Sequence, residues 1–308
     1  MKSTLSGIFG ILLLLVSGLP TAPCEAQGFL AQRLRNRLKQ NMARLEQTPD
    51  CKRIKLAGLD LAIWEPDAKA HTEKLPIIIF SHGFHGNNTQ SSFLMEDLAK
   101  AGYLVIAPNH KDAPASGGGF SKPDEKMTDA SAWTDASHRD RREDIVKLID
   151  ALKKDPFWNS KIDWSKLALA GHSLGGYTVM GLAGAWPAWK IEGIKAVLAL
   201  SPYCQPFAKH QTLKDMHVPI MYQSGTLDPG IAPFIRRPGG AFEQTTSPEE
   251  YVLFDRVHHF SFSNLNRNEE QKKLISHYSI AFLNKYVLDD SKANPQEKLA
   301  GVRQVLLK

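Results

Sequence analysis

The sequence has little cysteine and no recognisable metal motif. Its 308 residues include three cysteines, too few for a disulfide scaffold, and neither a CxxC pair nor an HExxH motif is present to bind zinc. The main apolar run, Ile8 to Val16, falls well short of the roughly 20 residues that a membrane-spanning helix needs. With 22 glycines and 18 prolines, the chain also lacks the composition of collagen or of a disordered protein. We therefore expect neither a structural metal centre nor wholesale disorder.

The chain has ample apolar material for a buried core. Hydrophobic residues make up 43% of it and charged residues 23%, which is typical of a globular protein. A length of 308 residues is compatible with one large α/β domain preceded by shorter segments.

The first segment has the pattern of a secretory signal. Lys2 precedes the short apolar run and small residues follow it. Cys24-Glu25-Ala26 then offers a cleavage position before Gln27, and Ala22 is the alternative position. Residues 1–26 are therefore predicted to be a signal peptide, and the protein to be secreted or periplasmic. Removal of Cys24 would leave Cys51 and Cys204 in an oxidising compartment, where the sequence is compatible with a disulfide or with two free thiols.

Residues 27–50 are predicted to form a basic amphipathic extension. Residues 27–56 carry the entire net charge of +6, because their eight basic side chains face only two acidic ones. We expect the extension to dock on its own domain, and contact of residues 29–45 with an anionic surface is the alternative. No platform of aromatic side chains accompanies the arginines, so nucleic-acid binding is not expected. The apolar stripe of this helix consists of Leu30, Leu34, Leu38, Met42 and Leu45.

From residue 51 onward, apolar strand patterns alternate with helical patterns. This order predicts an α/β fold, in which helices cover both faces of a mostly parallel central sheet. Residues 51–308 are expected to form a single domain, and residues 109–137, which include three consecutive glycines, a long surface loop. Strands are expected at 54–56, 59–64, 76–80, 103–107, 167–170, 194–200, 219–224 and 251–254, with the first two antiparallel, and helices at about 91–101, 145–152, 177–183 and after 262.

The strand at 167–170 runs directly into Gly171-His172-Ser173-Leu174-Gly175-Gly176. A GxSxG sequence between a strand and a helix describes a nucleophile elbow, where the glycines allow a sharp turn that exposes the serine hydroxyl. Ser173 is therefore the predicted nucleophile. The alternative, an ordinary glycine-serine turn, does not account for the flanking strand and helix or for the partners that follow along the chain.

A serine nucleophile needs a base, and the base needs an acid that holds it in the right tautomer. In chain order the serine should come first, then the acid, then the histidine. Asp228 follows the strand at 219–224, at the sheet edge where parallel sheets place their sites, and is the predicted acid, with Asp255 as the alternative. The base is His258 or His259, which follow the next strand.

Cleavage of an ester places negative charge on the carbonyl oxygen, which backbone N–H groups can stabilise. The predicted donors are Leu174, directly after the nucleophile, and Phe84, in the stretch Ser81-His82-Gly83-Phe84 that follows the strand at 76–80. His82 and His85 have a spacing that metal ligands can share, but no nearby carboxylate or cysteine completes a ligand set. No metal and no cofactor is therefore expected.

Two of these segments resemble known signatures. Phe80-Ser81-His82-Gly83-Phe84 and the elbow sequence are similar to those of platelet-activating factor acetylhydrolases and of bacterial dienelactone-hydrolase-like serine esterases. The resemblance runs over residues 51–287 and implies an α/β-hydrolase fold. The family commonly has an HFxF run, here His259-Phe260-Ser261-Phe262, which favours His259 over His258. True dienelactone hydrolases have a cysteine nucleophile, so Ser173 implies ester hydrolysis instead of dienelactone chemistry. Asn109-His110-Lys111-Asp112 and Arg142-Glu143-Asp144-Ile145 also belong to the resemblance.

Together these features predict a secreted serine hydrolase that cleaves carboxylic esters. The stretch between Leu200 and Pro219 is too short for an inserted lid domain, so we expect an open cleft with walls from residues 109–137 and 229–250. A phospholipid acetyl ester, a short-chain ester and a polyester all remain open as substrates. The alternative of a different kind is a non-catalytic binding module with a hydrolase fold.

Overall fold

The computed structural model describes residues 51–67, 73–118, 121–246 and 248–308. The predicted signal peptide (1–26) and basic extension (27–50) lie outside the described residues, so both stay predictions. The described residues all belong to one compact unit, Asp50–Lys308. Of the helices in this part of the chain, none has the length and apolar character needed to cross a membrane.

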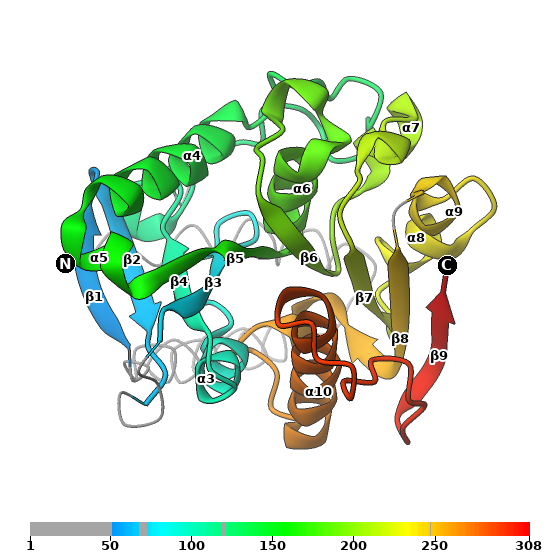
Figure 1. The fold of residues 1–308 in the computed structure, drawn as a ribbon. Coiled ribbons are helices and arrows are strands. Elements are labelled where there is room, and N and C mark those ends of the chain that lie inside the picture. Colours follow the sequence, from blue (N-terminus) through cyan, green and yellow to red (C-terminus); the bar gives the residue numbers. More distant parts are fainter. Residues whose placement is uncertain (1–50, 68–72, 119–120, 247) are drawn as a thin grey trace, which may run out of the picture. The chain divides into compact units, whose positions relative to one another are not determined.

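A nine-stranded sheet runs through the domain in the order β1-β2-β4-β3-β5-β6-β7-β8-β9 (Figure 1). The five pairings from β4 to β8 are parallel, whereas β1, β2 and β9 add antiparallel strands at the two edges. The mostly parallel sheet and its opening antiparallel pair are therefore confirmed. The strands are β1 (Lys52–Leu56), β2 (Leu59–Trp64), β3 (Leu75–Ser81), β4 (Leu104–Pro108), β5 (Ile162–His172), β6 (Ile194–Leu200), β7 (Ile220–Leu227), β8 (Glu249–His258) and β9 (Val302–Leu307).

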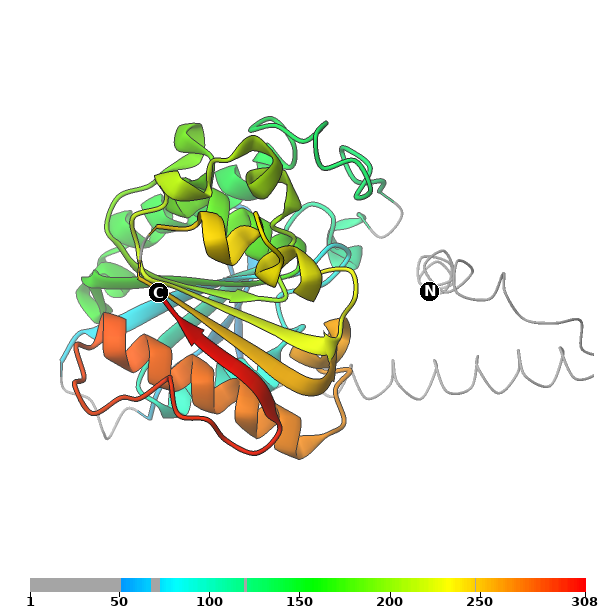
Figure 2. The ribbon, with the colours of Figure 1, turned by 90° about the vertical axis from the view of Figure 1, so that its right-hand side faces the viewer.

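Helices cover both faces of the sheet, as predicted for the α/β-hydrolase fold. On one face lie α4 (Arg139–Lys154), α5 (Pro156–Lys161), α6 (Leu174–Met180) and α7 (Gln205–His210), and on the other α3 (Ser92–Lys100) and α10 (Glu269–Val287) (Figures 1 and 2). The short helices α8 (Ala232–Arg236) and α9 (Ala241–Gln244) lie between β7 and β8 along the chain.

The isoleucine-rich strand β3 shows why two layers of core form. Neighbouring residues of a strand point to opposite faces, so Ile77 and Ile79 join the core layer that contains α4, while Ile78 and Phe80 join the layer that contains α3 and α10. A strand that is buried on both faces is apolar throughout, which is the pattern of a central parallel strand.

Two features differ from the sequence predictions, and the connections between elements follow them. Strand β8 continues to His258, so Asp255 and His258 lie in the strand and not in a loop after it. The edge strand β9 was not predicted, because Val302, Val305 and Leu306 do not alternate regularly with polar residues. In the described part of residues 109–137 the only helical turn is η1 (Pro114–Ser116), which confirms a long loop, and the chain between β6 and β7 holds only α7 and η4 (Leu213–Asp215).

Neither Cys51 nor Cys204, the two cysteines of the described chain, is part of a disulfide. Cys204 is buried in the core layer that contains α4, whereas Cys51 packs against the layer on the opposite face of the sheet. The two sulfur atoms therefore lie on opposite faces of the sheet. Of the two possibilities that the sequence left open, the structure has two thiols and not a disulfide.

Candidate active site

Ser173 lies in a sharp turn between β5 and α6. Its backbone has φ 56° and ψ −117°, a conformation that non-glycine residues rarely adopt. A β-carbon added to Gly175 would lie 1.9 Å from the carbonyl oxygen of Ser81, so only glycine allows the helix to start this close to β3. The local sequence thus holds the Ser173 hydroxyl at the carboxyl edge of the sheet.

The structure brings together three of the predicted catalytic side chains. His259 Nε2 lies 2.9 Å from Ser173 Oγ, and His259 Nδ1 lies 2.9 Å from Asp228 Oδ2. Asp228 follows β7 directly and is only 4% exposed, while His259 opens the short η5 turn (His259–Phe262) after β8. These contacts arrange the predicted nucleophile, base and acid in a chain.

The two alternative residues lie elsewhere. Asp255 forms an exposed ion pair with Arg303 at 3.0 Å, and His258 is an exposed residue at the end of β8. Neither has a contact with Ser173 among those of the described chain.

Ser201 joins the acid and the base, and sequence reasoning missed it. Its buried hydroxyl donates to Asp228 Oδ2 and lies 3.2 Å from His259 Nδ1. The residue follows β6 directly with φ 44°, so the strand's carboxyl end aims it at the same edge of the sheet. A serine after an apolar strand was the only available signal, and that signal is too common to be specific.

His172, the first of the two variable positions in the GxSxG motif, connects the loop that carries Gln90 with the turn that carries His259. Its Nδ1 accepts from Gln90 Nε2 at 2.9 Å, and its Nε2 donates to the carbonyl of His259 at 2.9 Å. Burial and then the neighbouring His259 lower the pKa of His172 well below its ordinary value, so the ring stays neutral with one N–H. The ring therefore supports the backbone that carries His259.

The two predicted oxyanion donors belong to segments next to Ser173, one adjacent in sequence and one in a neighbouring loop. A β-carbon on Gly83 would lie 3.4 Å from Ser173 Cβ, so the loop that carries Phe84 passes directly beside the nucleophile. Leu174 is the first residue of α6, where a backbone N–H has no partner within the helix. In the ranges that the structure describes, neither the Phe84 N–H nor the Leu174 N–H has an acceptor.

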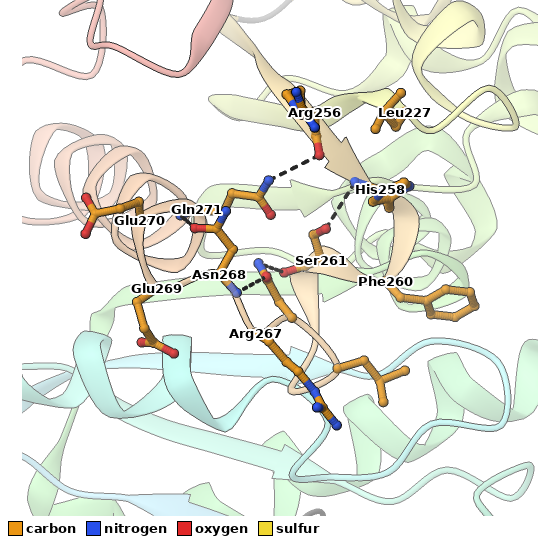
Figure 3. A pocket seen from close by; sticks show the side chains of 12 residues that line it. Leu227, Arg256, His258, Phe260, Ser261, Arg267, Asn268, Glu269, Glu270 and Gln271 are labelled. Atoms are coloured by element: carbon orange, nitrogen blue, oxygen red, sulfur yellow. Dashed lines mark hydrogen bonds between the residues drawn. The ribbon is translucent and has the colours of Figure 1, made fainter. Parts of the chain in front are cut away.

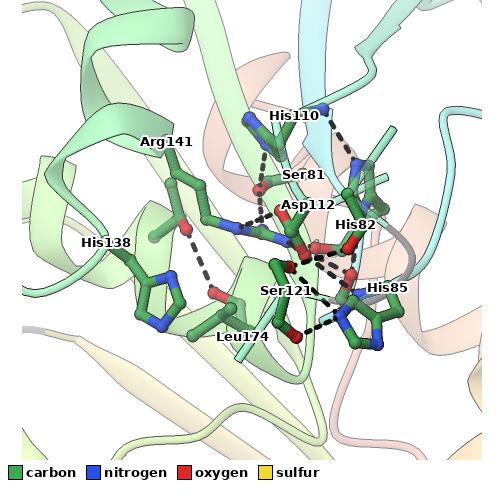
Figure 4. A network of polar contacts seen from close by, with 12 residues as sticks. Ser81, His82, His85, His110, Asp112, Ser121, His138, Arg141 and Leu174 are labelled. Atoms are coloured by element: carbon green, nitrogen blue, oxygen red, sulfur yellow. Dashed lines mark hydrogen bonds and ion pairs between the residues drawn. The ribbon is translucent and has the colours of Figure 1, made fainter. Parts of the chain in front are cut away.

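A buried polar cluster contacts the loop between His82 and His85 (Figure 4). It contains the Arg141–Asp112 ion pair and the rings of His82 and His110. Burial, followed by the charge of Arg141, lowers the pKa values of both histidines well below their ordinary range. Burial also raises the pKa of Asp144, which contacts His110 Nδ1 at 2.9 Å, to about 6.

The residues considered for metal binding are otherwise engaged. His82 Nδ1 donates to the carbonyl of Gly83, and His85 Nε2 contacts Ser121. The one candidate metal cluster among the described residues is Asp124, His138 and Asp140, whose ligand atoms lie within 4.8 Å of one another. Within this cluster the Asp124 carboxylate accepts a hydrogen bond from the backbone N–H of His138.

A hollow of about 980 Å³ lies between the end of β8 and the start of α10 (Figure 3). It gathers Leu227, Phe260 and Leu265, which are 45%, 53% and 48% exposed, together with polar and charged side chains. Leu227 precedes Asp228 and Phe260 follows His259, so two of these exposed apolar residues are neighbours in sequence of residues of the candidate site.

The chain is similar to known ester hydrolases. The family described as platelet-activating factor acetylhydrolase, isoform II, matches residues 56–154, a segment that includes Phe84, Asp112 and Arg141. Cutinase est1 of Thermobifida alba is 25% identical over 217 residues, which cover 70% of this chain and 62% of the cutinase.

Two other relatives match shorter parts of the chain. Platelet-activating factor acetylhydrolase of Gallus gallus is 27% identical over 147 residues, 35% of each protein. Dipeptidyl-peptidase 5 of Porphyromonas gingivalis is 31% identical over 117 residues, which cover 36% of this chain and 15% of the peptidase. The chain thus spans less than two thirds of the length of the acetylhydrolase, the peptidase and the first cutinase.

Proposed function

Because the chain is a member of the α/β-hydrolase superfamily and is similar to platelet-activating factor acetylhydrolases and cutinases, we propose that it is a serine hydrolase that cleaves carboxylic esters. The observation that carries the proposal is the position of His259, whose two ring nitrogens lie 2.9 Å from Ser173 Oγ and 2.9 Å from Asp228 Oδ2. A base held between a nucleophile and a buried acid is the arrangement that acyl transfer needs.

In the proposed reaction Ser173 Oγ attacks the ester carbonyl carbon while His259 Nε2 takes its proton. Asp228 keeps the proton of His259 on Nδ1 and stabilises the imidazolium that forms. The N–H groups of Phe84 and Leu174 donate to the carbonyl oxygen as it becomes negative. His259 then protonates the leaving alcohol, and a water molecule activated by the same imidazole releases the acid and restores Ser173.

The surroundings of the site favour esters with an apolar part. Leu227, Phe260 and Leu265 provide exposed apolar surface beside the catalytic loops, and the connection between β6 and β7 is too short to cover it. The relatives named as cutinases match 70% of this chain, which makes a polyester the second candidate substrate beside an acetylated or short-chain lipid ester.

Export is part of the proposal, on the strength of residues 1–26. N-terminal sequencing of the protein recovered from a secreting host should find a chain that begins near Gln27, whereas a retained Met1 would contradict export. Contact of residues 29–45 with an anionic surface is tested by deletion of residues 27–50, which should then weaken sedimentation with phosphatidylserine vesicles.

Fluorophosphonate labelling tests the enzyme proposal directly. We expect the wild type and Ser165→Ala, which removes an exposed serine hydroxyl, to label equally, and Ser173→Ala not to label. Equal labelling of the wild type and Ser173→Ala would refute the assignment. A series of p-nitrophenyl esters from acetate to palmitate, with a polyester film beside it, then separates the substrate classes.

A further inference from the structure

The loop beside Ser173 is held by hydrogen bonds at three consecutive peptide groups. In the first group, the carbonyl of His82 accepts from Arg141 Nη1 at 2.7 Å, and the N–H of Gly83 donates to Gln90 Oε1 at 3.0 Å. Both ends of this peptide are therefore fixed by buried or half-buried partners.

The next two peptide groups form hydrogen bonds with Arg141 and Asp112, which are paired with each other. The carbonyl of Gly83 accepts from Arg141 Nη2 at 3.2 Å, and the N–H of His85 donates to Asp112 Oδ2 at 2.9 Å. Between these two contacts lies the N–H of Phe84. The carbonyl of Gly83 also accepts from His82 Nδ1 at 2.7 Å and from the N–H of Gly86 at 2.9 Å. Because the carbonyl and the N–H of a trans peptide point in opposite directions, these bonds and the bond from Arg141 together turn the N–H of Phe84 away from Arg141.

Arg141 and Asp112 form one rigid unit. Arg141 Nε donates to Asp112 Oδ1 at 3.1 Å and Arg141 Nη2 to Asp112 Oδ2 at 2.8 Å, a two-pronged geometry that only a guanidinium provides. Arg141 is fully buried and Asp112 nearly so (Figure 4). Burial alone would raise the pKa of Asp112, but the charge and hydrogen bonds of Arg141 hold it well below its ordinary value.

We propose that the Arg141–Asp112 pair is a positioning element of the oxyanion hole, which helps to fix the Phe84 N–H so that it faces the carbonyl oxygen of an ester bound at Ser173. The inference rests on the proposed function. It is carried by the geometry of the three peptide groups and by the position of Gly83 against Ser173. A buried ion pair contributes little net stability on average, so its value here lies in the direction it imposes on the loop.

Arg141→Lys tests the proposal, because lysine keeps the charge but cannot bond Asp112 and two carbonyls in one plane. The matched control is Arg139→Lys on the same helix, where the arginine forms an exposed pair with Asp135. Loss of one oxyanion donor costs about 10²- to 10³-fold in kcat, so partial misalignment should cost about 10- to 100-fold. We expect KM within about twofold of the wild type, and the control unchanged.

Two further readouts separate positioning from general damage. A trifluoromethyl ketone, whose adduct with Ser173 carries an oxyanion, should bind Arg141→Lys more weakly in proportion to the fall in kcat/KM. The acidic limb of the plot of kcat/KM against pH should lie at the same pH in Arg141→Lys as in the wild type, since Ser173, His259 and Asp228 are unchanged. If Arg141→Lys does not fold, Asp112→Asn, which keeps the side-chain volume but weakens the pair, is measured in the same way.

The outcomes distinguish this proposal from the proposed function. A wild type that neither labels with fluorophosphonate nor hydrolyses any ester refutes both. A wild type that hydrolyses esters, together with a folded Arg141→Lys whose kcat and ketone affinity are unchanged, overturns the positioning role alone.

Discussion

Replacement of Asp228 by asparagine is the sharpest test of the proposed mechanism. The substitution leaves the size of the side chain unchanged but presents an amide where the carboxylate accepts from His259 Nδ1 at 2.9 Å. If the amide N–H₂ faces the ring, Nδ1 must become an acceptor and the proton moves to Nε2. Since Nε2 lies 2.9 Å from Ser173 Oγ, it can then no longer take the serine proton.

The expected magnitude follows from the burial of this contact. Asp228 is only 4% exposed and its carboxylate has two partners in the described chain, His259 and Ser201, so water cannot replace the lost charge. In triads of this kind the same substitution lowers kcat by about 10⁴-fold, or about 5.5 kcal/mol in the barrier. We expect a loss of that order, with KM changed much less.

The assay compares Asp228→Asn with Asp255→Asn, the other acid that the sequence left open. Asp255 pairs with Arg303 at the surface, so its replacement should leave kcat within about twofold. Circular dichroism and thermal unfolding show whether each variant is folded, and activities are compared at equal concentrations of folded enzyme. Full activity of a folded Asp228→Asn, or a large loss in Asp255→Asn, would refute the assignment of the acid.

Three other predictions follow from the contacts. Ser201→Ala removes a hydrogen bond to a buried carboxylate, so the free energy of unfolding should fall by about 1.5–3 kcal/mol in denaturant titrations, and an unchanged value would contradict the contact. Gly175→Ala would place a β-carbon 1.9 Å from a backbone oxygen and should cost more than about 3 kcal/mol, whereas Gly193→Ala, with open space but φ +87°, should cost about 1 kcal/mol in the same assay. Burial raises the pKa of Glu249 from 4.5 to about 8 despite the nearby Lys308, so its stabilising contribution is complete below pH 4.5 and is lost as the pH rises through 8. Glu249→Gln should therefore raise the melting temperature relative to wild type more at pH 9 than at pH 5, and an equal difference at both values would show that this carboxyl does not titrate as described.

Much of the fold and part of the site could be predicted because the relevant signals are local. Strand β3 is apolar on both faces because it is central, and this leaves a continuous run in the sequence. The elbow around Ser173 needs glycines where the backbone turns, so its spacing is visible without any tertiary contact. The position of Asp228 follows from the rule that sites lie beyond the carboxyl ends of parallel strands.

Tertiary structure decided the features that depend on which strand ends lie side by side at one edge of the sheet. Whether His258 or His259 faces Ser173 depends on how far β8 extends, and the sequence ended that strand too early. The sequence contains Ser201 and the Arg141–Asp112 pair as ordinary polar residues. In the sheet the strands lie in the order β4-β3-β5-β6-β7, so β3 lies between β4 and β5. The segments that follow the strands therefore lie side by side at one edge of the sheet, and this packing gives those side chains a common site. A residue's type is local information, whereas the partners that give it a role are set by packing over long distances in sequence.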